Sequence, residues 1–530
     1  MEPVDSPART VGEPAGDGVR RPDVPLAAVV AIACVAQFMV VLDTTIVNVA
    51  LPDMRRDLGL SAAGQQWVIT AYLVTFGGFL LLAARAGDLF GRRRVFQAGI
   101  AVFSLASLAG GLADTGWLLL AARAAQGLGA AALAPASLSL ITASHPDPAS
   151  RTKALGVWSA AASGAGTTGM VLGGVLTDAL SWRWVLFVNV PVGVGLWVAT
   201  IRLLAPAAGG RRQRLDVPGA LAVTAATAAL VFGISQATTS GWGSARVVAA
   251  LVTAAVLLAL FAAIETRVAQ PLIPPSIYRH RSLRIANVIT AALGALMTST
   301  ILFLSVYQQQ LLGYSPLRTG VSLIPWTLVL VAGTFAARRL MPVLRPVPLL
   351  VVGSTLTAAG LAWLAWLPDH PAYATHVLGP TLVAGVGMSL GVLPVTVLAT
   401  SGIAPTEAGL ASGLLNMGRQ IGGALGLAIL VTIATTVTDH SRERAAGAAT
   451  VHGYHVALLV AAALSVATAA TALLLLRRRR EAAGAPSPSP SAPSPSVPAA
   501  PTHPPAADPG PSSGAATAAV SAPAAADGTV

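Results

Sequence analysis

The sequence predicts an all-α membrane protein with fourteen transmembrane helices. Of its 530 residues, 54% are hydrophobic and only 10% are charged, and the mean hydropathy is +0.71. Soluble domains carry about 25% charged residues. Long apolar stretches, separated by short polar segments, also recur along almost the whole chain. Composition and patterning together indicate a chain that crosses a bilayer many times.

Each apolar stretch approaches the ~20 residues that a helix needs to cross the hydrocarbon core. The first stretch is too long for a signal peptide, so we expect it to be retained as a helix. We place the spans at 26–48, 64–84, 95–113, 117–141, 154–177, 184–204, 217–236, 246–265, 285–307, 319–337, 348–367, 376–400, 408–434 and 453–476.

The distribution of arginine predicts the orientation. An even number of spans puts both termini on one side, and most of the positive charge falls on that side, in the segments around 9–21, 85–94, 151–153, 202–214, 267–284, 338–345 and 477–480. Because Lys and Arg are in excess on the cytoplasmic side, both termini are predicted to be cytoplasmic. The net charge of +12 is thus spread over short inner segments and not gathered in one stripe, which argues against a nucleic-acid partner.

The polar segment GDLFGRRRVF at 87–96 carries the most specific pattern. Its distinctive residues are Gly87, Asp88, Gly91, Arg92, Arg93 and Arg94. A plain cytoplasmic hairpin would also be rich in arginine, but it would not need two glycines and an acid at fixed places before the arginines. The segment resembles the loop between the second and third helices of the major facilitator superfamily of transporters, whose pattern is G-x-L-a-D-r-x-G-r-r.

The resemblance implies a major facilitator fold, in which two six-helix bundles enclose a substrate site near the membrane midplane. Fourteen spans leave two additional helices, which we place at 217–236 and 246–265. The expected divisions are a cytoplasmic segment 1–25, a first bundle 26–204, the additional helices and their linker 205–284, a second bundle 285–476 and a disordered cytoplasmic tail 477–530 rich in Pro, Ala and Ser.

Asp43 stands inside the first apolar span, in the run LDTTIVNVALP. A charge at the centre of a membrane helix costs about 2.5–3.5 kcal/mol on insertion scales, so it is rarely kept without a use. Asp43 could be hydrated near the helix end, or it could pair structurally. The functional interpretation is a titratable carboxylate that exchanges a proton between the two membrane faces.

Arg123 is the candidate partner of Asp43. It lies within an apolar span, and Gln126 shares its helix face one turn away. The run R-x-x-Q-G-x-G-x-A also contains Gly127 and Gly129, which permit close helix packing. It matches the fourth-helix pattern of facilitator transporters, and this resemblance implicates Arg123 in proton coupling.

Small residues mark the fifth span. Gly166, Gly169 and Gly173 recur at helical spacing and predict a smooth packing stripe. The run GMVLGG, which ends at Gly174, resembles the antiporter motif G-P-x-x-G-G, with Met170 in place of proline. The glycines could serve packing alone.

Two further runs narrow the family. SWRWVLFVNVPVG at 181–193 and NMGRQIGGALG at 416–426 are similar to the sixth and thirteenth helices of the drug:proton antiporter family 2, the EmrB/QacA group. With LDTTIVNVALP, the resemblance covers about 26–476. It implies proton-driven efflux of a hydrophobic drug, antibiotic or secondary metabolite by alternating access.

Candidate groups for the substrate cavity come from the second half of the chain, where the spans 319–337 and 408–434 contain no acid beyond Glu407 just before the latter. We therefore expect a neutral, zwitterionic or anionic substrate. The candidates are Gln308, Gln309, Gln310, Trp326, Asn416 and Arg419. The glutamines and Trp326 would equally fit the interfacial end of a helix.

Other functions find less support. Cys34 is the only cysteine, the eight histidines show no metal-ligand spacing, and no phosphate-binding G-x-x-x-x-G-K-[ST] loop is present. We expect no enzyme activity, no metal and no cofactor, and a monomer in a bacterial plasma membrane whose partners are the bilayer, protons and a small hydrophobic molecule. The alternatives are a proton-coupled importer or uniporter and a non-transporting membrane sensor.

Overall fold

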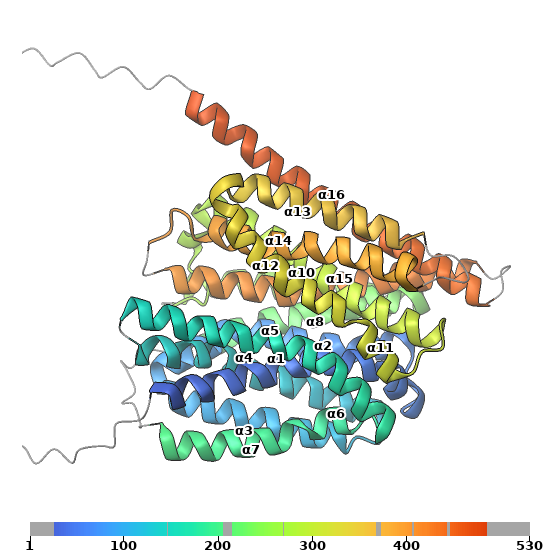
Figure 1. Cartoon of the computed structure of the whole chain (residues 1–530), viewed down its shortest axis with the longest axis horizontal. Coiled ribbons are helices and arrows are strands. Elements are labelled where there is room, and N and C mark those ends of the chain that lie inside the picture. The colour runs from blue at the N-terminus through green and yellow to red at the C-terminus, as the bar shows by residue number, and fades with distance from the viewer. Residues whose placement is uncertain are drawn as a thin grey trace, which may run out of the picture. The chain divides into compact units, whose positions relative to one another are not determined.

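The computed structural model describes residues 26–145, 147–204, 215–268, 270–366, 373–404, 407–441 and 446–484. The predicted cytoplasmic segment 1–25 and most of the predicted tail lie outside them. The first part of the chain forms α1 (Leu26–Asp57), α2 (Ala62–Phe90), α3 (Arg92–Gly111), α4 (Gly116–Ser144), α5 (Pro148–Ala179), the short α6 (Trp184–Phe187) and α7 (Asn189–Leu203) (Figure 1).

Two helices follow, α8 (Val217–Ser240) and α9 (Ala245–Arg267), and then a short 3-10 turn, η1 (Pro275–Arg279). The last part of the chain forms α10 (Arg281–Gln310), α11 (Pro316–Ser322), α12 (Ile324–Leu344), α13 (Pro346–Leu364), the π-helical turn η2 (Tyr373–Leu378), α14 (Gly379–Thr400), α15 (Ala408–His440) and α16 (Ala446–Gly484). The described residues contain helices and no strand, so the all-α prediction is confirmed.

Thirteen helical segments of the described chain are long and apolar enough to cross a membrane. The fourteenth predicted span, 154–177, lies in α5, a helix of 32 residues whose Ser, Thr and Gly content makes it less apolar than the others. It packs along α1 as part of the first bundle. The chain is therefore a multi-pass membrane protein.

The predicted spans are shorter than the helices at several ends; α2, for example, continues to Phe90 and α15 to His440. α1 continues beyond 48 to Asp57, because its polar end still supports a helical turn in which Arg56 pairs with Asp53. α16 continues beyond 476 to Gly484, since arginine, glutamate and alanine are good helix formers. Gly91 allows the most abrupt break between two spans: its φ of +93° lets α2 end and α3 begin at once.

The helices pack as two bundles with α8 and α9 beside them. α1 lies against α5, and α4 lies against both α2 and α3; in the second bundle α10 lies against α15, and α14 lies against α12 and α13. α8 packs on α9 and contacts both α2 and α15. The two bundles also meet directly, through α2 with α15, α1 with α10 and α5 with α11.

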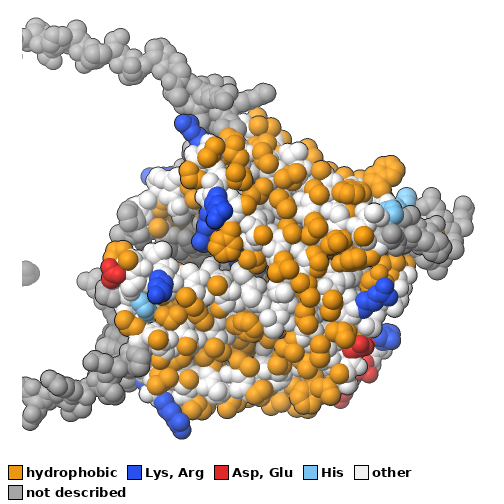
Figure 2. Space-filling model, in the orientation of Figure 1, with side chains coloured by type: hydrophobic (Ala, Val, Ile, Leu, Met, Phe, Trp, Pro, Cys, Tyr) orange, Lys and Arg blue, Asp and Glu red, His pale blue; other side chains and the backbone are white. Residues whose placement is uncertain are grey.

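The surface is apolar, as a lipid-facing surface must be. Figure 2 shows hydrophobic side chains over the visible face, with charged side chains gathered toward its two ends. Large apolar side chains are exposed on many helices, including Leu105, Val256 and Val343. α9 is buried along only 11% of its most apolar window, so most of this helix is available to lipid.

Candidate functional site

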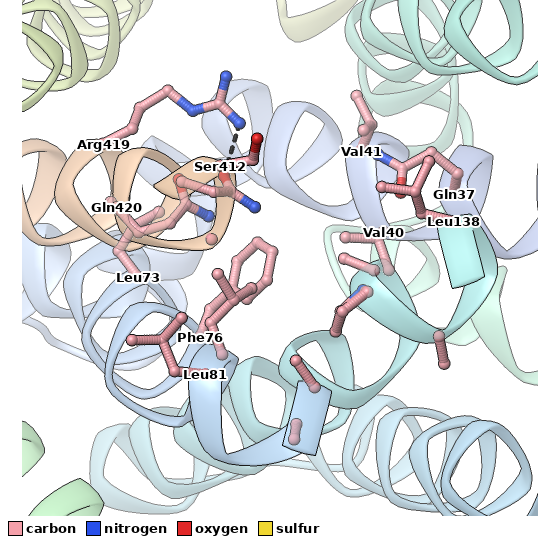
Figure 3. A pocket seen from close by; sticks show the side chains of 18 of the residues that line it. Gln37, Val40, Val41, Leu73, Phe76, Leu81, Leu138, Ser412, Arg419 and Gln420 are labelled. Atoms are coloured by element: carbon pink, nitrogen blue, oxygen red, sulfur yellow. Dashed lines mark hydrogen bonds between the residues drawn. The ribbon is translucent and has the colours of Figure 1, made fainter. Parts of the chain in front are cut away.

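A cavity of about 1060 Å³ lies between the two bundles. α1, α2 and α4 line it on one side, and α10 and α15 line it on the other. Figure 3 shows Val40 and Val41 of α1 across open space from Arg419 and Gln420 of α15, with Phe76 of α2 below. A mostly apolar cavity with a few polar groups is typical of a site for a small molecule.

The mouth of the cavity is the end at which α2 passes into α3. Its lining there includes Arg85, Gly87, Asp88, Arg92, Ser139, Thr142, Ala408 and Gly409. This is the end that the arginine distribution predicts to be cytoplasmic. The conformation is thus open toward the predicted cytoplasmic side.

Hydrogen bonds between the bundles close the opposite end. Ser305 Oγ of α10 donates to the backbone oxygen of Asn48 in α1 at 2.9 Å. Gln309 Nε2, one turn further along α10, donates to the backbone oxygen of Val49, also at 2.9 Å. These bonds join the two bundles directly, so they must break before this end can open.

α5 and α11 make a second contact at the closed end. A Cβ on Gly174 of α5 would lie only 2.7 Å from Leu317 Cα and from the backbone oxygen of Pro316. Nearby, Thr167 of α5 donates from its hydroxyl to the hydroxyl of Thr327 at 2.8 Å. The absence of a side chain at Gly174 allows the backbones of the two bundles to touch.

Asp43 and Arg123 form a buried ion pair beside the cavity. Arg123 Nη1 donates to Asp43 Oδ2 at 2.6 Å, and the two side chains are 2% and 0% exposed. Gln126 Nε2 and Asn189 Nδ2 both donate to Asp43 Oδ1, at 3.0 and 3.1 Å. Three donors therefore converge on one carboxylate, which satisfies its ionised form.

Other groups hold Arg123 in place. Its Nε donates to the backbone oxygen of Val68 at 3.0 Å, its Nη1 also donates to Gln126 Oε1 at 2.9 Å, and its Cζ lies 4.6 Å from the centre of the Tyr72 ring. Arg123 and Tyr72 line the cavity, whereas Asp43 does not. The Asp43 carboxylate thus lies one layer behind the cavity wall, and Arg123 stands between it and the cavity.

Asn189 was not among the residues singled out from the sequence. It is fully buried at the start of α7, and its partner Asp43 is 146 positions away in the chain. An amide within the apolar run VLFVNVPVG was the available signal. Ser107 of α3 was not singled out either. Its hydroxyl accepts a hydrogen bond from Gln126 Nε2, a contact between two helices that the sequence does not display.

The motif glycines of α4 and α5 are packing positions with one exception. A Cβ on Gly127 or Gly129 would strike the backbone of α2 or α3 respectively, and one on Gly169 or Gly173 would strike α1. Gly166 does not belong to this stripe, because a Cβ there would meet no atom within 4 Å. The predicted stripe of 166, 169 and 173 is therefore too long: α5 approaches α1 closely at the latter two positions and not at the first.

The loop motif lies at the cavity mouth. Asp88 Oδ1 is 3.9 Å from Arg92 Nη2, and the Asp88 side chain is 71% exposed. Arg92 and Arg93 donate to the backbone oxygens of Ser139 and Ile201, at 3.3 and 2.9 Å. Gly87 and Asp88 line the mouth, whereas Arg94 is exposed and stands outside the cavity lining. The acid of the motif therefore has only a loose partner while the mouth is open.

Only part of the predicted cavity set lines the cavity. Asn416 and Arg419 do so, with Arg419 Nη2 donating to Asn416 Oδ1 at 2.7 Å. Gln308, Gln309 and Trp326 do not. All three belong to the closed end. Gln309 donates a hydrogen bond from one bundle to the other, and Gln308 accepts one from the Ser322 hydroxyl. The Trp326 side chain is buried, at 1% exposed. Their assignment to the cavity was wrong for this conformation, since helix packing has withdrawn them into the protein.

No group of three or more His, Cys, Asp or Glu side chains that could hold a metal ion occurs among the described residues.

Comparison with known proteins identifies the fold and the family. A family model described as Major Facilitator Superfamily matches residues 33–427. The puromycin resistance protein pur8 of Streptomyces alboniger is 44% identical over 439 residues, which cover 81% of this chain and 87% of the relative. The cephamycin export protein CmcT of Amycolatopsis lactamdurans is 41% identical over 417 residues, which cover 77% and 85%.

A solved structure shows the same fold. A bacterial homologue of the human lysosomal transporter Spinster, in an inward-facing and unoccupied conformation, aligns with a TM-score of 0.60 and 17% sequence identity, covering 86% of this chain and 98% of that one. At this identity the likeness shows the fold alone. The chain belongs to the Major Facilitator Superfamily, and the resemblance of its sequence to the drug:proton antiporter family 2 is confirmed.

Proposed function

We propose that this transporter exports a hydrophobic drug, antibiotic or secondary metabolite across the bacterial plasma membrane in exchange for protons. The observation that carries the proposal is the buried Asp43–Arg123 pair one layer behind the wall of a cavity large enough for such a molecule. Relatives named for puromycin resistance and cephamycin export support the direction and the class of substrate. Both termini and the cavity mouth lie on the cytoplasmic side in this proposal.

Asp43 is the proton carrier in the proposed cycle. Ionised, it accepts hydrogen bonds from Arg123, Gln126 and Asn189. A proton on Asp43 removes the charge that holds Arg123 and turns one acceptor oxygen into a donor. The guanidinium is then free to turn toward the cavity that it already borders. Protonation thus loosens the contacts among α1, α4 and α7, and this change favours the rocking of one bundle against the other.

The proton gradient is sufficient to drive export. One charge moving through 100 mV gains about 2.3 kcal/mol, and one pH unit adds about 1.4 kcal/mol. Together these energies hold a neutral substrate at a gradient of roughly several hundredfold. The cycle therefore needs no nucleotide.

The experiment that tests the proposal uses the purified chain in proteoliposomes with a pH-sensitive dye inside. Puromycin, a cephamycin and a panel of hydrophobic dyes are added outside under an imposed pH gradient. We expect at least one compound to drive proton movement in the direction opposite to its own. Movement of proton and compound in the same direction would instead identify an importer, the alternative that Met170 favours because it replaces the proline of the antiporter motif.

A truncated chain separates a transporter from a sensor. In the sensor interpretation the tail binds a signalling partner and the membrane domain transports nothing. We expect a chain ending at Gly484 to transport at the full rate. Absence of transport by both the full and the truncated chain, with every compound of the panel, would favour the sensor.

Asp88 is proposed to latch the mouth when it closes. In the open conformation its carboxylate is exposed and 3.9 Å from Arg92, so its contribution to stability is small. We expect Asp88→Ala to lower the transport rate roughly two- to fivefold, the equivalent of one ion pair of up to about 1 kcal/mol, without changing the melting temperature. Asp114→Ala is the matched control, since Asp114 is an exposed acid between α3 and α4. Equal rates in both variants and the wild type would exclude the latch.

A further inference from the structure

Arg419 is a cation in the cavity wall, and no carboxylate of the described residues forms an ion pair with it. It lies on α15, is exposed to the cavity and donates to Asn416. Its backbone is held firmly, because a Cβ on Gly294 of α10 would strike the Arg419 carbonyl. The guanidinium therefore projects from a rigid helix contact.

The charge balance of the cavity is positive. Its lining contains the four arginines Arg85, Arg92, Arg123 and Arg419 and the single acid Asp88. Asp43 is engaged by Arg123 behind the wall, and Asp88 is at the mouth. Arg419 is thus the lining cation that faces the interior of the cavity with neither acid beside it.

Closure of the cavity would leave this charge without solvent. In the open conformation water can hydrate the guanidinium, which has five N–H donors. Alternating access closes the mouth and expels much of that water, and a buried charge without a partner is costly. A bound anion would remove this cost, and it would do so only when substrate is present.

We propose that Arg419 binds an anionic group of the transported molecule, most naturally a carboxylate, which the planar guanidinium can bind with two parallel hydrogen bonds. Asn416 orients the guanidinium from one turn away. The apolar body of the molecule packs on the wall formed by Leu73, Phe76 and Leu81 of α2, which Figure 3 shows below Arg419. The substrate class is an amphipathic organic anion or zwitterion. This inference deepens the proposed function but concerns binding alone.

The test compares binding of two probes that differ in one charge. Pyrenebutyrate and its methyl ester share the same apolar body, and only the first carries a carboxylate at neutral pH. Binding to the detergent-solubilised full chain is measured by fluorescence titration without any gradient. We expect the carboxylate to bind the wild type roughly ten- to a hundredfold more tightly than the ester, as one charge-assisted hydrogen-bonded contact provides.

Variants assign the preference to one side chain. Arg419→Gln should lose it, with the carboxylate falling to the affinity of the ester, while the affinity of the ester stays unchanged and shows that the cavity is intact. Arg419→Lys keeps the charge and should retain part of the preference. Arg339→Gln is the matched control, since Arg339 is exposed on α12 and stands outside the cavity lining, and it should retain the preference in full.

Three outcomes would overturn the inference: equal binding of the two probes to the wild type, a preference that survives in Arg419→Gln, or binding of neither probe. Because no gradient is used, binding can succeed where proton-driven transport fails. A failure of the proposed exchange of substrate for protons is therefore distinguishable from a failure of the anion site.

Discussion

Proteoliposomes that contain Asp43→Asn are expected to show no proton movement in response to substrate, at the level of empty vesicles. Asparagine keeps the shape of the side chain but cannot release or take up a proton at any pH in the working range. The variant resembles the protonated state that the cycle must visit, so the fold should tolerate it. Exchange of labelled for unlabelled substrate needs no net proton movement and should persist.

Asp178→Asn is the control for this variant. Asp178 is an exposed acid near the end of α5 and lies outside the hydrogen-bonded network of Asp43. Its replacement should leave coupled transport unchanged. Export by Asp43→Asn at the normal, gradient-driven rate would show that another group carries the proton.

Thermal unfolding tests whether Asp43 and Arg123 depend on each other as a buried charge pair. Arg123→Gln leaves the Asp43 carboxylate buried without its cation, which typically costs about 3–5 kcal/mol. The double variant Asp43→Asn/Arg123→Gln removes both charges and should recover most of that loss in thermal unfolding. A purely structural pair would show the same recovery in the double variant. Transport by Asp43→Asn then decides, because a purely structural pair would leave proton-coupled transport intact in that variant.

Gly174→Val is expected to drive the transporter away from the conformation described above. The backbone of α11 lies 2.7 Å from the site of the new Cβ, whereas ordinary carbon contacts are about 3.5–4.0 Å. The two bundles must therefore separate by about 1 Å at this end. Overpacking of this kind costs about 1–3 kcal/mol, which changes the ratio of two conformations roughly 5- to 150-fold.

Spin labels measure the expected shift. In a Cys34→Ser background, labels at Asp178 of α5 and Arg318 of α11, both exposed, report the separation of the bundles at the closed end. We expect the population with the larger separation to grow in Gly174→Val and the transport rate to fall. Gly166→Val is a matched control on the same helix, because a Cβ at 166 meets no atom within 4 Å. Unchanged distances in Gly174→Val would show that this contact does not control the closed end.

The fold could be predicted from sequence because membrane insertion is a local property. A helix spans a bilayer when about 20 consecutive residues are apolar, and this needs no knowledge of neighbours. Among the described residues, α5 is the predicted span that falls short by this measure, because of its Ser, Thr and Gly content. Its glycines predicted the contact with α1, but only packing could show that Gly166 lies outside it.

The buried ion pair was also visible in the sequence, because a charge within an apolar run stands out whatever its partner. The sequence by itself thus determined the fourteen-helix fold and the candidates Asp43, Arg123 and Arg419. The tertiary structure alone decided that Asn189 completes the carboxylate site, that Gln308, Gln309 and Trp326 belong to the closed end, and that Arg419 faces the cavity. The physical reason is that insertion depends on each segment separately, whereas the surroundings of a polar side chain depend on how its helix is rotated and which distant helices pack against it.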